Sequence, residues 1–355
     1  MAWNFTGRLH QQDIGEGELM DEKYICRICD NSDGNFPFIA YEMMYGMKDE
    51  FKYFECRFCG CLQISEIPND LTKYYPTDYY SFEDQPDVQY KLIDWVKFYL
   101  RRTRTNYIVT GKGIVGKAIS YLRDDNTFDW DWFRKSGIGL DAAILDVGCG
   151  AGKLLKDMYN HGFSNLSGID PYITHDITFK SIKIFKKELT ELEGIFDLIM
   201  LHHSFEHMIE PLLVLQQINR LLKPMCYALI RVPLSGSYAW RKYGPNWVQL
   251  DAPRHLFLHT PKSMNILATQ SGFEIAAVVF DSTSFQFTGS EKYMMNIPLK
   301  SLKSNANSSG NSIFDQASID AYKIKAAELN RASEGDQACF YFRKTSDSES
   351  EKFGS

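Results

Sequence analysis

One short segment constrains the fold of this chain more than any other, because it joins an apolar strand to three closely spaced glycines and then to a helix. The segment reads Ile144-Leu-Asp-Val-Gly-Cys-Gly-Ala-Gly-Lys-Leu-Leu155, and its glycines are Gly148, Gly150 and Gly152. Glycine suits such a turn where the backbone needs a positive φ, or where a ligand approaches too closely for a Cβ atom. The order of strand, glycine turn and helix predicts a cofactor-binding loop in an α/β sheet.

The glycine spacing argues against two common nucleotide-binding loops. A phosphate loop requires G-x-x-x-x-G-K-[ST], but Gly148 and Gly152 lie one residue too close, and Leu154 replaces the hydroxyl that would hold magnesium. A dinucleotide loop has the pattern G-x-G-x-x-G, whereas this segment has G-x-G-x-G. A plain turn between a strand and a helix would normally need a single glycine.

From residue 142 onward, short β-branched runs alternate with helical segments, which is typical of helices packed around a largely parallel sheet. We expect a helix over 209–222, with Pro211 near its start and Lys223-Pro224 as its stop. A Ser/Asn-rich stretch over 301–312 predicts a surface loop. The predicted strands are 143–147, 166–169, 196–201, 227–232, 273–280 and 338–343.

The glycine rhythm, with Asp146 ahead of it, resembles the first motif of class I S-adenosylmethionine (SAM)-dependent methyltransferases. The resemblance implies an α/β, Rossmann-like fold with a seven-stranded sheet, and SAM as the cofactor. It also implies that Asp146 helps to hold the methionyl ammonium. The loop backbone would line the amino-acid and ribose end of SAM, through residues Gly148, Cys149, Gly150 and Gly152.

A second carboxylate is expected at the end of the next strand, because two vicinal ribose hydroxyls call for a bidentate acceptor. Asp170, in Ser167-Gly-Ile-Asp-Pro171, lies twenty residues past Gly150 at that position. After the third strand of that fold, which falls between the predicted strands 166–169 and 196–201, Leu189 of Lys187-Glu-Leu189 would border the adenine, with a surface turn as the alternative.

The segment after the predicted strand 196–201 carries the candidate catalytic groups, since ligands of open α/β sheets bind at the carboxyl ends of strands. Its residues 202–207 read His-His-Ser-Phe-Glu-His. Imidazole titrates near neutral pH, so His207 is the expected general base, with Glu206 orienting it or holding the substrate. We expect His203 to contact cofactor or acceptor; the structural alternative is that the histidines cap strand and helix.

Two further observations bear on the acceptor. The tetrapeptide [ND]-P-P-[YF] of amino-directed nucleobase methyltransferases is missing after residue 201, which argues against exocyclic nucleobase amines. Farther on, Asp251, Arg254 and His255 cluster after the predicted strand 227–232. Arg254 is a candidate bidentate clamp for a carboxylate or phosphate, and His255 a substrate contact; an internal Asp–Arg pair that fixes the loop is equally compatible.

Five of the eight cysteines lie between Cys26 and Cys61. Two C-x2-C pairs, Cys26/Cys29 and Cys56/Cys59, suit a tetrahedral structural zinc site with no position left for an activated water. Disulfides are the alternative, and Cys61 is an alternative ligand to Cys59.

This cysteine module, a Tyr-rich stretch over 74–82 and the methyltransferase motifs together resemble the zinc-containing sugar methyltransferases of deoxysugar and surface-polysaccharide pathways. In the C-methylating members, a Glu-His pair matched here by Glu206 and His207 surrounds a nucleotide-linked keto-sugar, together with bridge residues. Tyr79 and Tyr80 would contact the substrate here. The stretch lacks the histidine that some C-methylating members carry, which leaves O-methylation of a sugar hydroxyl open.

The resemblance covers most of residues 24–345 and implies several zones. They are a zinc-binding module over 20–70, an aromatic bridge and basic amphipathic helical segment over 71–140, a methyltransferase domain over 141–345 with a surface insertion at about 285–335, and a disordered tail over 346–355.

Charge separates the alternative functions. Residues 88–123 contain eight basic residues against one acid, which raises the alternative of an RNA methyltransferase with a zinc-knuckle RNA-binding module. The whole chain carries a formal net charge of −6, whereas polyanion-binding domains are usually basic, so nucleic acid is disfavoured as a partner. A non-catalytic SAM-binding scaffold is the other alternative. With neither a signal peptide nor a membrane-spanning stretch evident, we expect a cytoplasmic protein.

Overall fold

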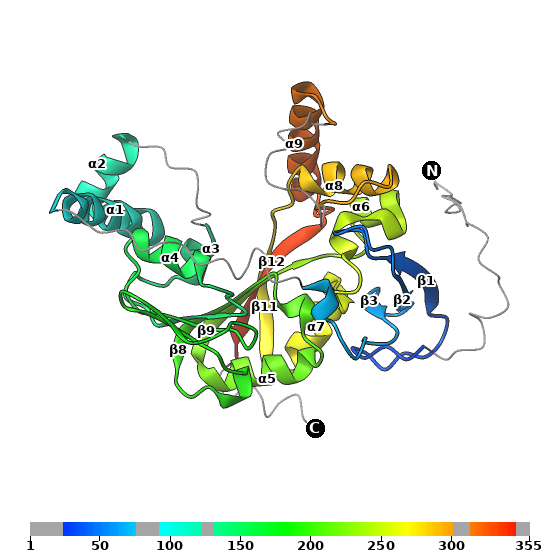
Figure 1. The fold of residues 1–355 in the computed structure, drawn as a ribbon. Helices are drawn as coiled ribbons and strands as arrows, with labels where there is room; N and C mark the ends of the chain where they lie inside the picture. Colours follow the sequence, from blue (N-terminus) through cyan, green and yellow to red (C-terminus); the bar gives the residue numbers. More distant parts are fainter. Residues whose placement is uncertain (1–23, 76–91, 123–130, 301–312, 346–355) are drawn as a thin grey trace, which may run out of the picture.

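The computed structural model describes residues 24–75, 92–122, 131–300 and 313–345, with the backbone alone for 92–95 and 131. The predicted surface loop at 301–312 and tail at 346–355 lie outside these ranges. The described chain is built around an eight-stranded sheet of order β11-β12-β9-β8-β4-β5-β7-β6. Figure 1 labels four strands of this sheet, β8, β9, β11 and β12.

The centre of the sheet is parallel, as the alternation of strands and helices predicts. Neighbours β9, β8, β4, β5 and β7 all pair in parallel. Strand β12 runs antiparallel between β9 and β11. The parallel strands are β4 (Ile144–Val147), β5 (Leu166–Ile169), β7 (Ile182–Phe185), β8 (Phe196–His202) and β9 (Leu222–Pro233), and the others are β11 (Phe273–Phe280) and β12 (Gln337–Lys344).

The prediction of seven strands is wrong by one. A short strand β6 (Ile177–Phe179) folds back against β7 in an antiparallel hairpin and becomes the sheet edge. Lys180 sits in the turn with φ 55°, a left-handed conformation that tightens it. The extra strand is only three residues long and partly exposed, so it leaves little hydrophobic signal in the sequence.

Helices pack beside the parallel strands, and their ends follow the local sequence. Helix α4 (Lys153–Asn160) begins directly after Gly152, and α5 (Pro211–Leu221) begins at its proline and ends just before Lys223-Pro224, as predicted. Helix α7 (Pro261–Gln270) starts with a capping box between Thr260 and Ser263. The smaller helices α3 (Asp131–Ser136) and α6 (Tyr238–Tyr243) lie in connections.

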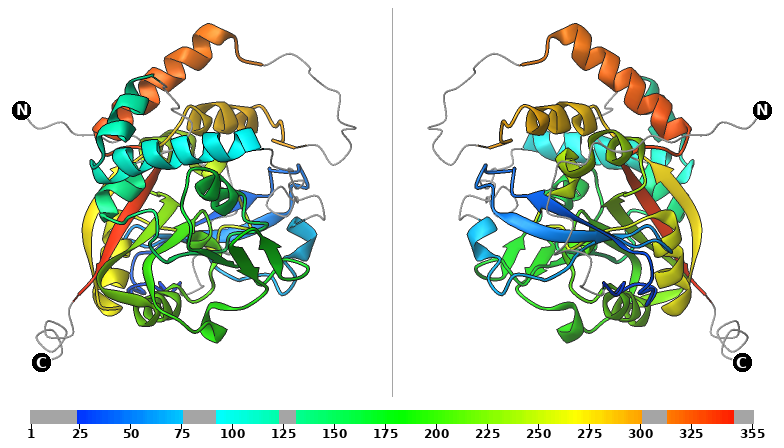
Figure 2. Two further views of the ribbon diagram at one scale, coloured as in Figure 1. Left: turned by 90° about the vertical axis from the view of Figure 1, so that its left-hand side faces the viewer. Right: turned by 90° about the vertical axis from the view of Figure 1, so that its right-hand side faces the viewer.

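Two groups of helices extend from the sheet. Helices α1 (Leu92–Thr110) and α2 (Ile114–Leu122) form a hairpin in the basic segment, where the sequence predicts an amphipathic helix. Helices α8 (Phe285–Met294) and α9 (Gln316–Arg331) form the insertion between β11 and β12. Because β11 runs parallel to the central strands, α8 follows at the same end of the sheet as their carboxyl ends (Figure 2).

The cysteine-rich segment builds a second sheet that is completed by a strand from the segment after β9. Its strands are β1 (Phe36–Tyr41), β2 (Glu50–Glu55) and β3 (Leu62–Ile64). The fourth strand, β10 (Phe257–Leu258), comes from the segment after β9 and pairs antiparallel with β3.

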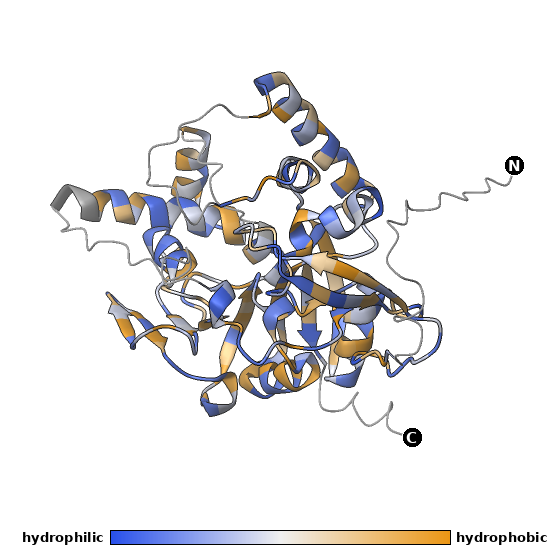
Figure 3. Cartoon of the chain, turned by 45° about the vertical axis from the view of Figure 1, so that its right-hand side comes forward, coloured by the Kyte–Doolittle hydropathy of each residue, from blue (hydrophilic) through white to orange (hydrophobic). Residues whose placement is uncertain are grey.

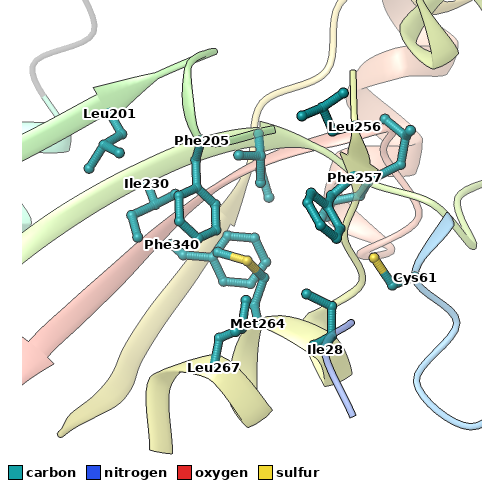
Figure 4. Close-up of a cluster of buried hydrophobic side chains, with 14 of the residues drawn as sticks. Ile28, Cys61, Leu201, Phe205, Ile230, Leu256, Phe257, Met264, Leu267 and Phe340 are labelled. Carbon is teal, nitrogen blue, oxygen red and sulfur yellow. The ribbon is translucent and has the colours of Figure 1, made fainter. Parts of the chain in front are cut away.

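The two sheets share one hydrophobic core. Ile28 and Cys61 from the cysteine module pack in the same buried cluster as Phe205, Phe257 and Met264 (Figure 4). Hydrophobic and hydrophilic residues alternate along the helices (Figure 3). Burial of this shared cluster makes the position of the cysteine module depend on the loops after β8 and β9.

Candidate active site

The glycine loop after β4 adopts the conformation that its sequence predicts. Gly148, Gly150 and Gly152 have φ values of 73°, 54° and 75°, which side-chain-bearing residues rarely adopt. A Cβ atom at Gly148 would also lie 2.5 Å from Cβ of Ser204, which follows β8. The loop therefore needs glycine for backbone geometry and for its close contact with the β8 segment.

Two carboxylates flank this loop. Asp170, just after β5, accepts hydrogen bonds from the backbone N–H groups of Gly150 at 2.9 Å and Tyr172 at 2.9 Å. Asp146 in β4 is 3% exposed, and burial together with the charge of Asp170 raises its pKa to about 8. Burial also raises the pKa of Asp170.

This arrangement fits the groups that SAM would bring. Two buried carboxylates with raised pKa values are unfavourable as anions, because they are desolvated and repel each other. A cationic ligand would stabilise them, and the methionyl ammonium of SAM is such a cation. Asp170 retains acceptor capacity beside its two backbone donors, as ribose hydroxyls require. Of the other predicted contacts, Cys149 lies in the loop, and buried Leu189 follows β7 in a short 3-10 helix, η3 (Leu189–Glu191).

The candidate catalytic residues lie at the carboxyl end of β8. His203 has φ 52°, a left-handed conformation that is uncommon for histidine. A 3-10 helix, η4 (Phe205–His207), follows immediately and buries Glu206 completely while leaving His207 half-buried. The left-handed turn at His203 therefore ends β8, and η4 starts two residues later.

The protonation of His203 follows from its partners. Its Nε2 atom lies 2.7 Å from Nη1 of Arg231 in β9. Arginine can only donate, so Nε2 accepts and the proton of neutral His203 resides on Nδ1. This Nδ1 lies 3.4 Å from Oε1 of Glu206.

Glu206 is a buried anion surrounded by imidazoles. Burial opposes its ionisation, but the contact with His203 and the charges of His207 and His255 together lower its pKa to about 2. Neither carboxylate oxygen has a hydrogen-bond partner of regular geometry among the described residues. A buried carboxylate in this state is a strong acceptor for any donor that enters.

His207 is oriented by the loop after β9. Its Nδ1 lies 2.8 Å from the carbonyl oxygen of Arg254, which can only accept a hydrogen bond. The proton of neutral His207 therefore sits on Nδ1, and Nε2 keeps its lone pair. The hydroxyl of Tyr75, from the Tyr-rich stretch, lies 3.4 Å from the same Nδ1.

His255 lies against the same cluster but is buried. Its Nδ1 donates to the carbonyl oxygen of Gln249 over 2.7 Å, and its Nε2 lies 3.8 Å from Oε1 of Glu206. Burial, followed by the charge of His207, lowers the pKa of His255 to about 4. The structure thus brings His203, Glu206, His207 and His255 into one group.

The side chain of Arg254 has partners within the protein, which agrees with the alternative of an internal Asp–Arg pair that fixes the loop. Its guanidinium pairs with Asp251 at 2.6 Å and with Glu42 of the cysteine module at 3.0 Å. Its Nη1 donates to the carbonyl oxygen of Tyr74 over 3.2 Å. The side chains of Arg254 and Glu42 are fully buried, so the pair fixes the loop against the module.

The four predicted zinc ligands converge. The Sγ atoms of Cys26 and Cys59, and those of Cys29 and Cys56, are each 3.6 Å apart. Four sulfur atoms at about 2.3 Å around a tetrahedral zinc ion would be separated by about 3.8 Å, so the donor set fits that metal. No disulfide joins any of the eight cysteines, all of which lie within the described ranges, in contrast to the disulfide alternative.

Both cysteine pairs sit in turns of the same form. The carbonyl of Cys26 accepts from the N–H of Asp30, and that of Cys56 accepts from the N–H of Gly60, at 2.9 and 2.8 Å. Asp30 and Gly60 both have positive φ values. Cys61 lies outside the four-sulfur group, with its Sγ 3.9 Å from Nδ1 of His259.

Two of the predicted site residues lie outside the described ranges, and three residues of the site were not predicted. Tyr79 and Tyr80 lie outside the described residues. Three residues that contact the site, Arg231, Glu42 and Tyr75, are not among those predicted from the sequence. Only Tyr75 carried a signal, since it belongs to the Tyr-rich stretch; the other two meet the site through contacts distant in sequence.

Comparisons with known proteins agree on the general class. A family model described as "Methyltransferase domain" matches residues 87–278, more than half of the chain. EEF1A lysine methyltransferase 2 of Mus musculus is 51% identical over 39 residues, which are 11% of this chain and 16% of that protein. The protein of the same name from Homo sapiens is 49% identical over 39 residues, 11% of this chain and 16% of its own length. The chain thus spans about a sixth of the length of these curated relatives.

Solved structures of low identity are also similar. A SAM-dependent methyltransferase from Archaeoglobus fulgidus is 19% identical, with a TM-score of 0.35 over 57% of this chain and 86% of its own. A putative sarcosine dimethylglycine methyltransferase from Galdieria sulphuraria is 16% identical, with a TM-score of 0.40 over 71% of this chain and 98% of its own.

None of the helices within the described ranges is long and apolar enough to cross a membrane.

The match over residues 87–278 includes the glycine loop, the β8 segment and β9. With this match, the chain belongs to the methyltransferase domain family.

Proposed function

We propose that this protein is a SAM-dependent methyltransferase that methylates a nucleotide-linked sugar, with His207 as the general base. One observation carries the assignment of the base. Nδ1 of His207 is committed to the carbonyl oxygen of Arg254, so Nε2 is the atom with a lone pair available for a proton.

The cofactor-binding residues would be Asp146 for the ammonium, Asp170 for the ribose and the backbone of the glycine loop, with Leu189 beside the adenine and His203 near the methionyl end. A SAM molecule held by these residues would supply a sulfonium methyl group for the acceptor atom, with S-adenosylhomocysteine as the other product. Nε2 of His207 accepts the proton that the acceptor hydroxyl or carbon acid loses. Glu206 stabilises the imidazolium that forms, because it is an anion of low pKa.

The sugar class is supported by the combination of features in one chain. The cysteine module, the Tyr-rich stretch and the Glu206-His207 pair resemble the zinc-containing sugar methyltransferases, and Tyr75 of that stretch lies beside His207. Tyr79 and Tyr80 remain expected substrate contacts. Arg254 and His255 would act on the substrate only through their hold on the loop and on Glu206, since both are buried.

We also propose that Cys26, Cys29, Cys56 and Cys59 bind a structural Zn²⁺. The fit of the four sulfur atoms to a tetrahedral ion supports this. The metal would fix the two turns that carry the cysteines. The second turn contacts the methyltransferase domain directly, because the hydroxyl of Ser235 donates to the carbonyl oxygen of Gly60 over 2.9 Å.

A lysine side chain of a protein is the second candidate acceptor, because the curated relatives of partial similarity are named as lysine methyltransferases. The matched region is 39 residues long and is a small part of those proteins. We therefore place this candidate second.

A screen with SAM carrying a radiolabelled methyl group tests the proposal. Nucleotide-linked sugars, ribosomal RNA and a protein extract are offered in parallel, and the label is then located on carbon, oxygen or nitrogen. We expect label on a sugar carbon or oxygen. Label that enters only RNA, or only lysine residues of protein, would contradict the sugar assignment.

A further inference from the structure

A pocket of about 360 Å³ opens beside His203, on the side of β8 away from the glycine loop. Its lining includes His203, Arg231, Gln249, Phe285, Gln286 and Asp336. In the strand order β12-β9-β8-β4-β5, His203 follows β8, Arg231 lies in β9 and Asp336 directly precedes β12, whereas the cofactor loop follows β4. The pocket is therefore placed to receive a second ligand across His203 from the cofactor.

We infer that this pocket binds the sugar ring of the methyl acceptor, as an uncharged polyhydroxyl ligand. The inference rests on the proposed function and deepens it, because it names the subsite and the part of the acceptor that enters it. The nucleotide diphosphate would remain outside.

The charge of the pocket favours a neutral ligand. Arg231 is the single lysine or arginine among the residues that line it. Its guanidinium is already paired with Asp281 at 2.5 Å and donates to His203 at 2.7 Å. A diphosphate needs cations with free charge, so this pocket is a poor site for it.

The polar atoms of the pocket match hydroxyl groups. Three glutamines, Gln249, Gln286 and Gln337, line the pocket, and an amide both donates and accepts hydrogen bonds, as sugar hydroxyls do. Gln337 already accepts from Gln249 and donates to Asp281, whereas within the described part of the chain the side-chain oxygens of Gln249 and Gln286 are not used in this way. Gln286 is 1% exposed, and its Nε2 donates to the carbonyl oxygen of Thr283 over 3.1 Å. Its Oε1 is buried with no hydrogen-bond partner among the described residues. A buried amide oxygen of this kind is costly unless a ligand or water donates to it.

An aromatic ring completes the pocket at its rim. Phe285 is 42% exposed although it stands at the start of α8. The ring face of a phenylalanine packs well against the C–H face of a pyranose. The volume of about 360 Å³ is at the low end for small-molecule sites, so it suits one monosaccharide rather than a whole nucleotide sugar.

Saturation-transfer difference NMR on the full chain with S-adenosylhomocysteine tests the inference. The probes are UDP-glucose, UDP-N-acetylglucosamine, GDP-mannose and dTDP-glucose, with UDP, GDP and dTDP as references that lack the sugar. We expect at least one probe to show its strongest saturation on pyranose protons. Strongest saturation on the nucleobase protons for every probe, or no saturation of pyranose protons at all, would overturn the inference.

Three variants make the test specific. Gln286→Leu keeps the size of the side chain but removes the orphaned oxygen, and it should raise the Kd of the responding probe about five- to tenfold, as expected for one lost hydrogen bond between neutral groups. Phe285→Ala should weaken the same probe, and it stays informative should Gln286→Leu fail to fold, because Phe285 is exposed. Gln316→Leu, at an exposed position on α9, is the matched control and should leave binding unchanged. Wild-type binding in both pocket variants would overturn the inference.

The outcome also separates this inference from the proposed function. Methylation of a nucleotide-linked sugar with an unchanged acceptor KM in both pocket variants would overturn the pocket assignment and leave the function standing. Pyranose binding that depends on Gln286, without methyl transfer to any sugar, would overturn the function and leave the pocket standing.

Discussion

The Nδ1 atom of His207 lies 2.8 Å from the backbone carbonyl oxygen of Arg254, and this contact sets the tautomer of the candidate base. The Arg254 side chain is in turn held by Glu42 of the cysteine module. The cysteine module is therefore connected to His207 through one buried ion pair, Glu42–Arg254, and one hydrogen bond to the Arg254 carbonyl oxygen.

Replacing the candidate base should slow methyl transfer strongly without changing the affinity for the cofactor product. We expect His207→Ala to lower kcat about 100-fold or more, in the range for loss of a general base. The affinity for S-adenosylhomocysteine, measured by calorimetry, should stay at the wild-type value because the glycine loop is untouched. Turnover equal to the wild type would remove His207 from the mechanism.

Breaking the buried ion pair should cost stability. Glu42→Ala leaves the Arg254 guanidinium with one fewer buried anion, and we expect the free energy of unfolding in urea to fall by about 3–5 kcal/mol. The matched control is Glu328→Ala, which breaks an exposed pair with Lys325 on α9 and should cost less than about 1 kcal/mol. Equal losses in the two variants would show that burial of the Glu42 pair is unimportant.

The metal content should distinguish the two candidate fourth ligands. Elemental analysis of the wild type should find about one zinc ion per chain. Cys59→Ser should lose the zinc and melt at a lower temperature, whereas Cys61→Ala should retain it, because Cys61 lies outside the four-sulfur group. Zinc retained in Cys59→Ser and lost in Cys61→Ala would reverse the ligand assignment, and a metal-free yet fully folded wild type would refute the structural role.

Mild acid should destabilise the fold through its buried histidines. Burial lowers the pKa values of His255 and His259 to about 4, from an ordinary value of 6.5. Below pH 6.5 the unfolded chain takes up protons that the folded chain does not, so stability present above pH 6.5 is lost as the pH falls toward 4. Each histidine contributes about 1.4 kcal/mol per pH unit in this window.

Urea unfolding at pH 7.5 and pH 5 measures this effect. His259→Gln should reduce the difference between the two pH values, whereas His175→Gln, at an exposed position, should not. A difference that is the same in both variants and in the wild type would contradict the role of His259.

The fold was predictable where the sequence is periodic. Strand β11 matches the predicted range 273–280, and the other predicted strands overlap β4, β5, β8, β9 and β12. The buried central strands are continuous apolar runs, which give a clear signal. The hairpin of β6 and β7 is short and flanked by charged residues, so it was missed.

The site was predictable where its residues are near one another in sequence. Glycine spacing pointed to the loop, and the segment 202–207 to the histidines. The partner of Arg254, Glu42, is separated from it by 212 residues, and that of His203, Arg231, by 28 residues. Such contacts depend on tertiary packing, and no local sequence pattern predicts either of them.

Calorimetric titration with S-adenosylhomocysteine tests the central claim most directly, because every other assignment requires a cofactor seated between the glycine loop and Asp170. We expect saturable binding of about one molecule per chain. Asp170→Asn should weaken it about 10- to 100-fold, as expected for hydrogen bonds to a charged group, while Asp320→Asn, at an exposed position on α9, should not. Absence of binding heat and of any melting shift, or equal affinity in the two variants, would contradict the account.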